Sequence, residues 1–148
     1  MNVKAETLQH IRRVQELLGR VLANLITRQA LHDNSKLESP EAEAFERLTP
    51  LLWDTTYGSE RYEELRRELG DALKHHYANN SHHPEHYREG IRGMSLIDLI
   101  EMLVDWRAAT ERHADGCIRK SIEINQKRFG YSDELKQIFI NTVNEFDF

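Results

Sequence analysis

The segment SLIDLIEMLVDW, residues 95–106, has the clearest local determinants of the fold. Ser95 and Asp98 form a capping-box pattern, in which two side chains satisfy each other's backbone N–H groups at a helix start. The apolar residues that follow recur at helical spacing and are Leu96, Leu99, Ile100, Leu103 and Trp106. Further apolar residues spread around the other sides. The pattern predicts a central helix of a bundle, ending near residue 113.

The other long segments of the chain also show a helical period, and none shows the two-residue alternation of a half-buried strand. Helices are predicted from about residue 5 to 29, 40 to 52, 60 to 78 and 117 to 128, and from about 133 onward. A chain of 148 residues favours one domain. The sequence therefore predicts an all-α fold, a single-domain helical bundle of about six helices spanning residues 1–148.

Local signals mark where several of these helices begin and end. Ser39 is predicted to cap the second helix with Pro40 at its first position, and Ser59 is predicted to cap the third. Gly130 is a natural C-terminal glycine for the fifth helix. Residues 79–94 contain asparagines, glycines and a proline, so this stretch is predicted to be a loop.

Composition restricts the classes of partner. The net charge of -5, from Lys+Arg 20 against Asp+Glu 25, gives no general attraction to nucleic acid or to anionic lipid. The single Cys117 excludes an internal disulfide and a cysteine-based zinc site. No stretch approaches the roughly 20 apolar residues of a membrane span, and the N-terminus has no apolar signal core. We expect a cytoplasmic protein that binds no membrane and forms no stable nucleic-acid complex.

Five of the eight histidines lie within twelve residues of one another, at positions 75, 76, 82, 83 and 86. On the predicted helix 60–78, the helical phase places His76 within the apolar stripe and His75 well to one side. His10 lies on the apolar stripe of the first predicted helix. A partly buried histidine that bonds a carbonyl would explain His10 equally well, so its role as a ligand is one of two readings.

Candidate ligands also come from two other segments. His32 and Asp33 are adjacent, Lys36 follows, and Asp105 lies on the central helix. The His-Asp pair alone is equally typical of a capping aspartate beside a surface histidine. Several buried titratable groups without partners would be costly, however, and a metal ion removes that cost by coordinating neutral imidazoles and carboxylates. The combined pattern therefore predicts a metal centre.

The order of these residues resembles that of a known superfamily. His10, His32-Asp33, His76, His82 or His83, and Asp105 follow the ligand order of the HD-domain metal-dependent phosphohydrolases, which are all-helical. The string HDNSK, residues 32–36, is similar to the HD-x-G-K form of that superfamily, with Ser35 in place of the glycine. The whole chain also resembles a family of small bacterial and phage HD-type proteins with the motifs HDxSK, HHxxNxxHHPEH and EMxxDW, found here at 32–36, 75–86 and 101–106.

The resemblance implies a centre of two divalent ions, among Mn, Fe, Co, Ni, Mg and Zn. The first ion would be held by His10, His32, Asp33 and Asp105, and the second by Asp33, His76 and one or both of His82 and His83. A metal-activated water would attack phosphorus. Lys36 would contact the substrate phosphate or orient Asp33, and Glu85 or His86 would move the proton.

The function expected from these residues is a metal-dependent phosphohydrolase that acts on a nucleotide or another small phosphate ester. The two alternatives are a di-iron oxygenase-type HD enzyme and a non-catalytic nucleotide-binding module. A homodimer is also consistent with the sequence, because Ile138, Phe139 and Phe146 of the last helix would suit either an interface or the core.

Overall fold

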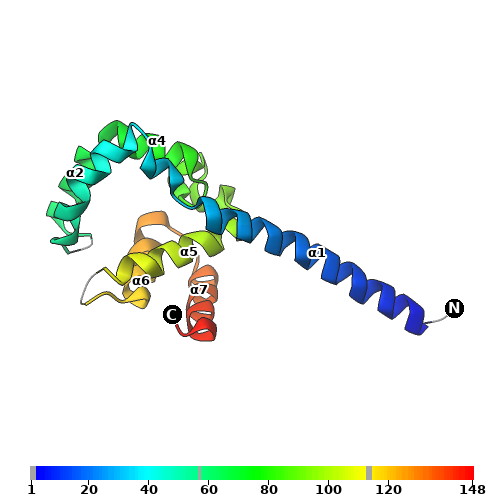
Figure 1. Cartoon of the computed structure of the whole chain (residues 1–148). Coiled ribbons are helices and arrows are strands. Elements are labelled where there is room, and N and C mark those ends of the chain that lie inside the picture. Colours follow the sequence, from blue (N-terminus) through cyan, green and yellow to red (C-terminus); the bar gives the residue numbers. More distant parts are fainter. Residues whose placement is uncertain (1–2, 57, 113–114) are drawn as a thin grey trace. The chain divides into compact units, whose positions relative to one another are not determined.

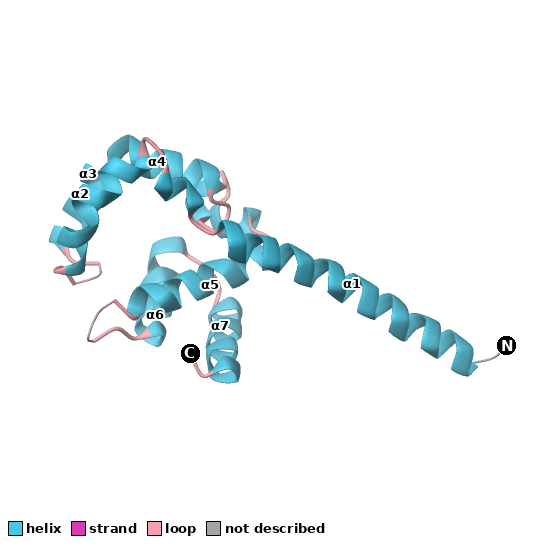
Figure 2. Ribbon diagram, in the orientation of Figure 1, coloured by secondary structure: helices cyan, strands magenta, loops and turns pink. Residues whose placement is uncertain are grey.

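A computed structural model of the chain describes residues 3–56, 58–112 and 115–148. All regular secondary structure in these ranges is helical, with seven α-helices, three 3-10 helices and no strand (Figure 2). The α-helices are α1 Val3–Leu31, α2 Glu41–Trp53, α3 Glu60–Glu68, α4 Gly70–Asn79, α5 Leu96–Thr110, α6 Ile118–Phe129 and α7 Asp133–Phe146 (Figure 1). The 3-10 helices are η1 Asn34–Leu37, η2 Pro84–His86 and η3 Gly90–Gly93. The predicted all-α fold is confirmed.

The chain divides into two compact units, residues 1–32 and 33–148. The first unit consists of α1, which has Glu6 in its first turn and Arg28 in its last, the charge order that the helix dipole favours. None of the residues of α1, Val3–Leu31, is buried, and apolar side chains such as Leu18 and Leu22 are exposed. All remaining helices, and the residues described below as a site, belong to the second unit.

The helix predicted over residues 60–78 is in fact two helices, which raises the number from about six to seven. Helix α3 ends at Glu68 and α4 begins at Gly70, whose φ of +50° lies in the left-handed region that glycine adopts without strain. Leu65 before this break, Leu69 at it and Ala72 after it are all buried. The helical period therefore continues across it, which is why the sequence pattern shows one helix.

The predicted start of the second helix is wrong by one residue. Helix α2 begins at Glu41, and Pro40 occupies the capping position rather than the first helical one. The reason is that the first turn closes on the carbonyl oxygen of Glu38, which accepts from the backbone N–H groups of Glu41 and Ala42. The side chain of Ser39 is therefore not the cap. Ser59 does cap α3, by accepting from the N–H of Tyr62.

The second unit contains two groups of buried apolar residues. One lies among α5, α6 and α7 and comprises Met102, Leu103, Ile118, Ile122, Tyr131, Phe139 and Val143. The other joins α2 to α3 and comprises Leu48, Leu65 and Leu69. In α7, Phe139 is part of the core, whereas Ile138 and Phe146 are exposed. Helix α5 ends at Thr110, before the end predicted near residue 113, and His113 lies outside the described residues.

The capping box at the start of α5 is present as predicted, and it also anchors the histidine-rich loop. Asp98 is buried and accepts hydrogen bonds from the N–H and hydroxyl of Ser95, from the hydroxyl of Ser81 and from the hydroxyl of Tyr87. Burial by itself raises the pKa of Asp98, but these hydrogen bonds hold it well below its usual range. The loop that contains His82 and His83 is thereby attached to α5.

Gly130 ends α6 in the left-handed conformation, as the sequence predicts. None of the helices in the described ranges is both long and apolar enough to cross a membrane.

Candidate metal centre

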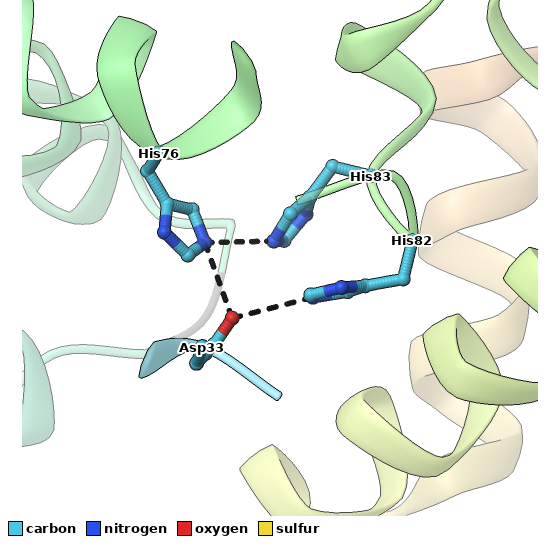
Figure 3. Close-up of side chains that lie close together, drawn as sticks. All are labelled: Asp33, His76, His82 and His83. Carbon is cyan, nitrogen blue, oxygen red and sulfur yellow. Dashed lines mark hydrogen bonds and ion pairs between the residues drawn. The ribbon is translucent and has the colours of Figure 1, made fainter. Parts of the chain in front are cut away.

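Four side chains of the second unit direct their ligand atoms toward one another, namely those of Asp33, His76, His82 and His83 (Figure 3). One ligand atom from each lies within 4.8 Å of all the others. Asp33 Oδ1 is 3.5 Å from Nε2 of His76 and 3.5 Å from Nε2 of His82. Nε2 of His76 is 2.9 Å from Nε2 of His83. We call these four residues the His/Asp cluster.

The spacing within the His/Asp cluster matches that of ligands around one divalent ion. Ligand atoms at about 2.1 Å from an ion lie about 3.4 Å apart in a tetrahedral shell and about 3.0 Å apart in an octahedral one. The observed separations of 2.9 and 3.5 Å are close to these two values. Imidazole nitrogen together with carboxylate oxygen suits zinc, iron, manganese, cobalt and nickel. The residues present therefore fit a metal ion.

Asp33 directly precedes η1, and its backbone makes the turn that presents its carboxylate. Its φ of 55° and ψ of 15° are left-handed, a region that aspartate and asparagine tolerate better than most residues. The two carboxylate oxygens have different neighbours. Oδ2 accepts from Nζ of Lys36 at 2.6 Å, whereas Oδ1 faces His76 and His82. Lys36 also lies over the ring of Phe45, at 5.0 Å from its centroid.

Helix α4 contributes His76, which is 2% exposed, whereas the side chain of its neighbour His75 is 42% exposed. This difference is the one that the helical phase predicts. Both imidazoles contact the fully buried Glu41: Nδ1 of His75 donates to Oε1 at 2.7 Å, and Nδ1 of His76 donates to Oε2 at 2.8 Å. Only His76 belongs to the His/Asp cluster.

His82 lies between the other members of the His/Asp cluster and α5. Its ring is 1% exposed, and its Nδ1 lies 3.2 Å from Oε1 of Glu101. On the other side, its Nε2 is 4.0 Å from Oδ2 of Asp105, one helical turn after Glu101. Asp105 therefore lies at the edge of the His/Asp cluster.

Burial determines the protonation state of the imidazoles. Together with the neighbouring His82 and His76, it lowers the pKa of His83 to about 3. Burial and the charge of Lys36 also lower the pKa of His76. For Glu41, burial raises the pKa, but hydrogen bonds from His75, His76 and other donors hold it below its usual value. At neutral pH, His76 and His83 are thus neutral and Glu41 is ionised, and a neutral imidazole is the form that binds a metal.

Two of the ligands proposed from the sequence, His10 and His32, belong to the first unit. His10 is exposed on α1, and His32 is the last residue of the first unit, with its backbone N–H donating to the carbonyl of Arg28. The His/Asp cluster could hold one ion, and a second ion with His10 and His32 among its ligands stays a prediction. Glu85 accepts from Arg128 at 2.7 Å, and Nδ1 of the exposed His86 donates to a backbone carbonyl at 2.8 Å.

Sequence reasoning missed the residues that support the ligands, above all Glu41, Ser35, Asn80 and Glu101. A glutamate in the first turn of a helix ordinarily faces solvent and favours the helix dipole, so Glu41 has no distinguishing signal. Ser35 did have one, because it stands where the HD-x-G-K pattern has glycine. Its hydroxyl donates to Oε2 of Glu41 at 3.0 Å.

A cleft of about 790 Å³ within the second unit adjoins the His/Asp cluster. Lys36, His76, His83 and Asp105 line it on the side of the cluster. Cationic and aromatic side chains line other parts, including Arg66, Arg128, Trp53, Tyr77 and Trp106. Trp106 also stacks on Phe129, with ring centroids 6.3 Å apart and planes 4° apart, so the core fixes its orientation.

The fold and the site together define the class of protein: an all-helical chain with a buried His/Asp cluster. The chain belongs to the family described as "Family of unknown function (DUF5662)", whose model matches residues 1–145. Comparisons with curated proteins and with solved structures gave no significant match.

Proposed function

We propose that this protein is an HD-type, metal-dependent phosphohydrolase that acts on a nucleotide or another small phosphate ester. The observation that carries the proposal is the convergence of Asp33, His76, His82 and His83 at ion-sized spacing beside a cleft. A divalent ion bound there would supply an activated water and neutralise charge on the phosphoryl oxygens. The order of the ligands along the chain agrees with the HD-type resemblance.

Lys36 is suited to two tasks in this reaction. Its ammonium group pairs with Oδ2 of Asp33, which fixes the carboxylate so that Oδ1 faces the imidazoles. It also lines the cleft and therefore brings a positive charge to a phosphate held beside the cluster. In a chain with a net charge of -5, such local charges must attract the anionic substrate.

The size and lining of the cleft support the proposal that the substrate is larger than inorganic phosphate. Its volume of about 790 Å³ lies in the range of about 300–1,000 Å³ that is usual for small-molecule sites. Arg66 and Arg128 add positive charge, and Trp106 offers an aromatic surface next to Asp105. Of the two groups expected to move the proton, Glu85 lines this cleft, although it is paired with Arg128.

The proposal is tested with the full chain, loaded in turn with Mn, Co, Ni, Mg, Fe and Zn. Each form is assayed against nucleoside mono-, di-, tri- and cyclic phosphates. We expect turnover of at least one class with one of these metals, and loss of that turnover on chelation. Stoichiometric metal binding without hydrolysis of any of these compounds would contradict the proposal. Oxygen consumption by the iron form alone would favour the oxygenase alternative.

A further inference from the structure

Glu41 is a carboxylate that the proposed reaction does not use directly, although it is the first residue of α2 and is 0% exposed. Glu43 and Glu46 on the same helix are exposed. An ionised carboxylate is costly to bury unless hydrogen bonds satisfy its oxygens. Three side-chain donors do so: Nδ1 of His75 at 2.7 Å, Nδ1 of His76 at 2.8 Å and Oγ of Ser35 at 3.0 Å.

These contacts determine which nitrogen of His76 is available to a metal. A neutral imidazole that donates from Nδ1 has its lone pair on Nε2. Nε2 of His76 is the atom that lies 3.5 Å from Oδ1 of Asp33. Because the second oxygen of Glu41 accepts in the same way from His75, one carboxylate fixes the tautomers of two successive histidines. A metal-ligating histidine ordinarily has such a partner, and the partner orients the ring.

Ser35 extends the same network to the loop that carries Asp33. Its hydroxyl donates to Glu41 and accepts from Nδ2 of Asn80 at 2.7 Å. The same Nδ2 donates to the backbone carbonyl of His76 at 2.8 Å, at the end of α4. Glycine at this position would have no side chain to make either contact. The serine that departs from the HD-x-G-K pattern thus connects the loop, α2 and α4.

We propose that Glu41 is a positioning residue of the metal centre: it selects Nε2 of His76 as the ligand atom and, through Ser35, fixes the loop of Asp33 before the ion binds. This inference rests on the metal centre of the proposed function. It predicts that the ligand side chains already have their positions in the metal-free protein, because none of these contacts involves an ion. Glu41 itself contacts neither the ion nor the substrate.

The test is Glu41→Gln in the full chain, with Glu43→Gln as the matched control on the same helix. Glutamine keeps the shape but has one acceptor oxygen and one donor NH₂, so it cannot accept from both imidazoles. The tautomer of His76 is read from ¹⁵N NMR of the metal-free protein, and Mn²⁺ affinity is measured by titration calorimetry. We expect loss of the single Nδ1–H form and a Kd for Mn²⁺ about ten- to hundred-fold higher, with no change in Glu43→Gln.

A folded Glu41→Gln protein with the wild-type tautomer and wild-type Mn²⁺ affinity would overturn the inference. If this variant does not fold, Ser35→Ala replaces it, since it removes one hydrogen bond to Glu41 and leaves both imidazoles in place. We expect its Kd for Mn²⁺ to rise about ten-fold, as for one lost hydrogen bond to a charged group; an unchanged Kd would overturn the inference. Neither readout requires turnover, so a failure of the hydrolase proposal remains distinct from a failure of this one.

Discussion

Lys36 Nζ lies 2.6 Å from Oδ2 of Asp33, and this ion pair turns the other carboxylate oxygen toward the imidazoles of the His/Asp cluster. The side chains are 32% and 17% exposed, so solvent screens the pair less than it screens a surface ion pair. A lysine in this position acts on the site both through Asp33 and through its own charge.

Replacing Lys36 with methionine tests both effects. We expect kcat/KM for the active phosphate ester to fall by at least about 100-fold, because a preorganised charge next to the phosphoryl group is lost. Lys74→Met is the matched control, since Lys74 forms a pair with Asp71 at the same spacing along the chain but with side chains 81% and 92% exposed. Wild-type kcat/KM in Lys36→Met would contradict a role for this charge.

Asp33 is predicted to be required for its charge rather than for its backbone shape. Asparagine tolerates the left-handed conformation that Asp33 adopts, so Asp33→Asn is expected to keep the fold. The neutral amide is a much weaker ligand, and we expect Mn²⁺ binding to weaken by more than about 100-fold and turnover to disappear. Circular dichroism checks that the fold is kept, and titration calorimetry measures the Mn²⁺ affinity. Unchanged metal affinity in a folded Asp33→Asn protein would remove Asp33 from the centre.

Arg66 is predicted to contribute to substrate binding. It lines the cleft with its side chain 29% exposed, while its Nε donates to Glu63 at 2.8 Å. We expect Arg66→Gln to raise KM about ten-fold with little change in kcat, because the lost charge is remote from the reacting phosphate. Arg61→Gln is the control on the same helix, where the pair with Glu64 is at the surface. Equal kinetics of the two variants would argue against the prediction.

The parts of this structure that depend on local signals are visible in the sequence. Helical spacing predicts the all-α fold, and the pattern of Ser95 with Asp98 predicts the capping box. Helical phase also places His76 inward and His75 outward. By contrast, the break at Gly70 leaves the apolar period intact, so periodicity alone does not reveal it.

The supporting residues of the site depend on contacts between distant segments. Glu41 is 34 residues from His75 and 35 from His76, and no local pattern distinguishes it from the exposed glutamates of the same helix. Glu101, one helical turn before Asp105, lies beside Nδ1 of His82, a residue 19 positions earlier in the chain. Residue type and order thus indicate the candidate ligands, but the groups that orient them become evident only when the fold brings α2 against α4 and the loop of His82 against α5.

The metal-free protein is predicted to lose stability below neutral pH. The pKa of His83 is about 3 in the folded protein, whereas an unfolded histidine has a pKa near 6.5, so the unfolded state binds the additional proton between these values. The free energy of unfolding therefore falls as the pH falls below about 6.5, and His76 acts in the same direction. Glu41, whose pKa is lowered, adds a further loss below about 4.5.

Urea unfolding of the metal-free protein at pH 7.5, 6.5, 5.5 and 5 measures this dependence, and His83→Gln is the comparison. Each histidine contributes a slope of at most about 1.4 kcal/mol per pH unit, with the sign of greater stability at higher pH. We expect a smaller slope in His83→Gln. A free energy of unfolding that stays constant from pH 7.5 to 5 would show that the buried imidazoles do not resist protonation.

Asp98 is predicted to stabilise the fold and, through the loop, the metal centre. Its two oxygens accept from the N–H and hydroxyl of Ser95 and from the hydroxyls of Ser81 and Tyr87. Asparagine offers one acceptor oxygen and turns an NH₂ group toward some of these donors. Buried donors that lose a charged acceptor cost about 1–3 kcal/mol each, so we expect Asp98→Asn to lower the free energy of unfolding by about 2–4 kcal/mol.

Asp98→Asn also distinguishes whether Asp98 anchors the loop of His82 or is itself a metal ligand. Ser81 directly precedes His82, so loosening its bond to Asp98 is expected to weaken Mn²⁺ binding several-fold in protein that remains folded. Asp71→Asn, at an exposed position of α4, should change neither stability nor affinity. If Asp98→Asn abolished Mn²⁺ binding outright while the free energy of unfolding stayed at the wild-type value, Asp98 would be a ligand itself. A joint, partial loss of both is the result that the four hydrogen bonds to its carboxylate predict.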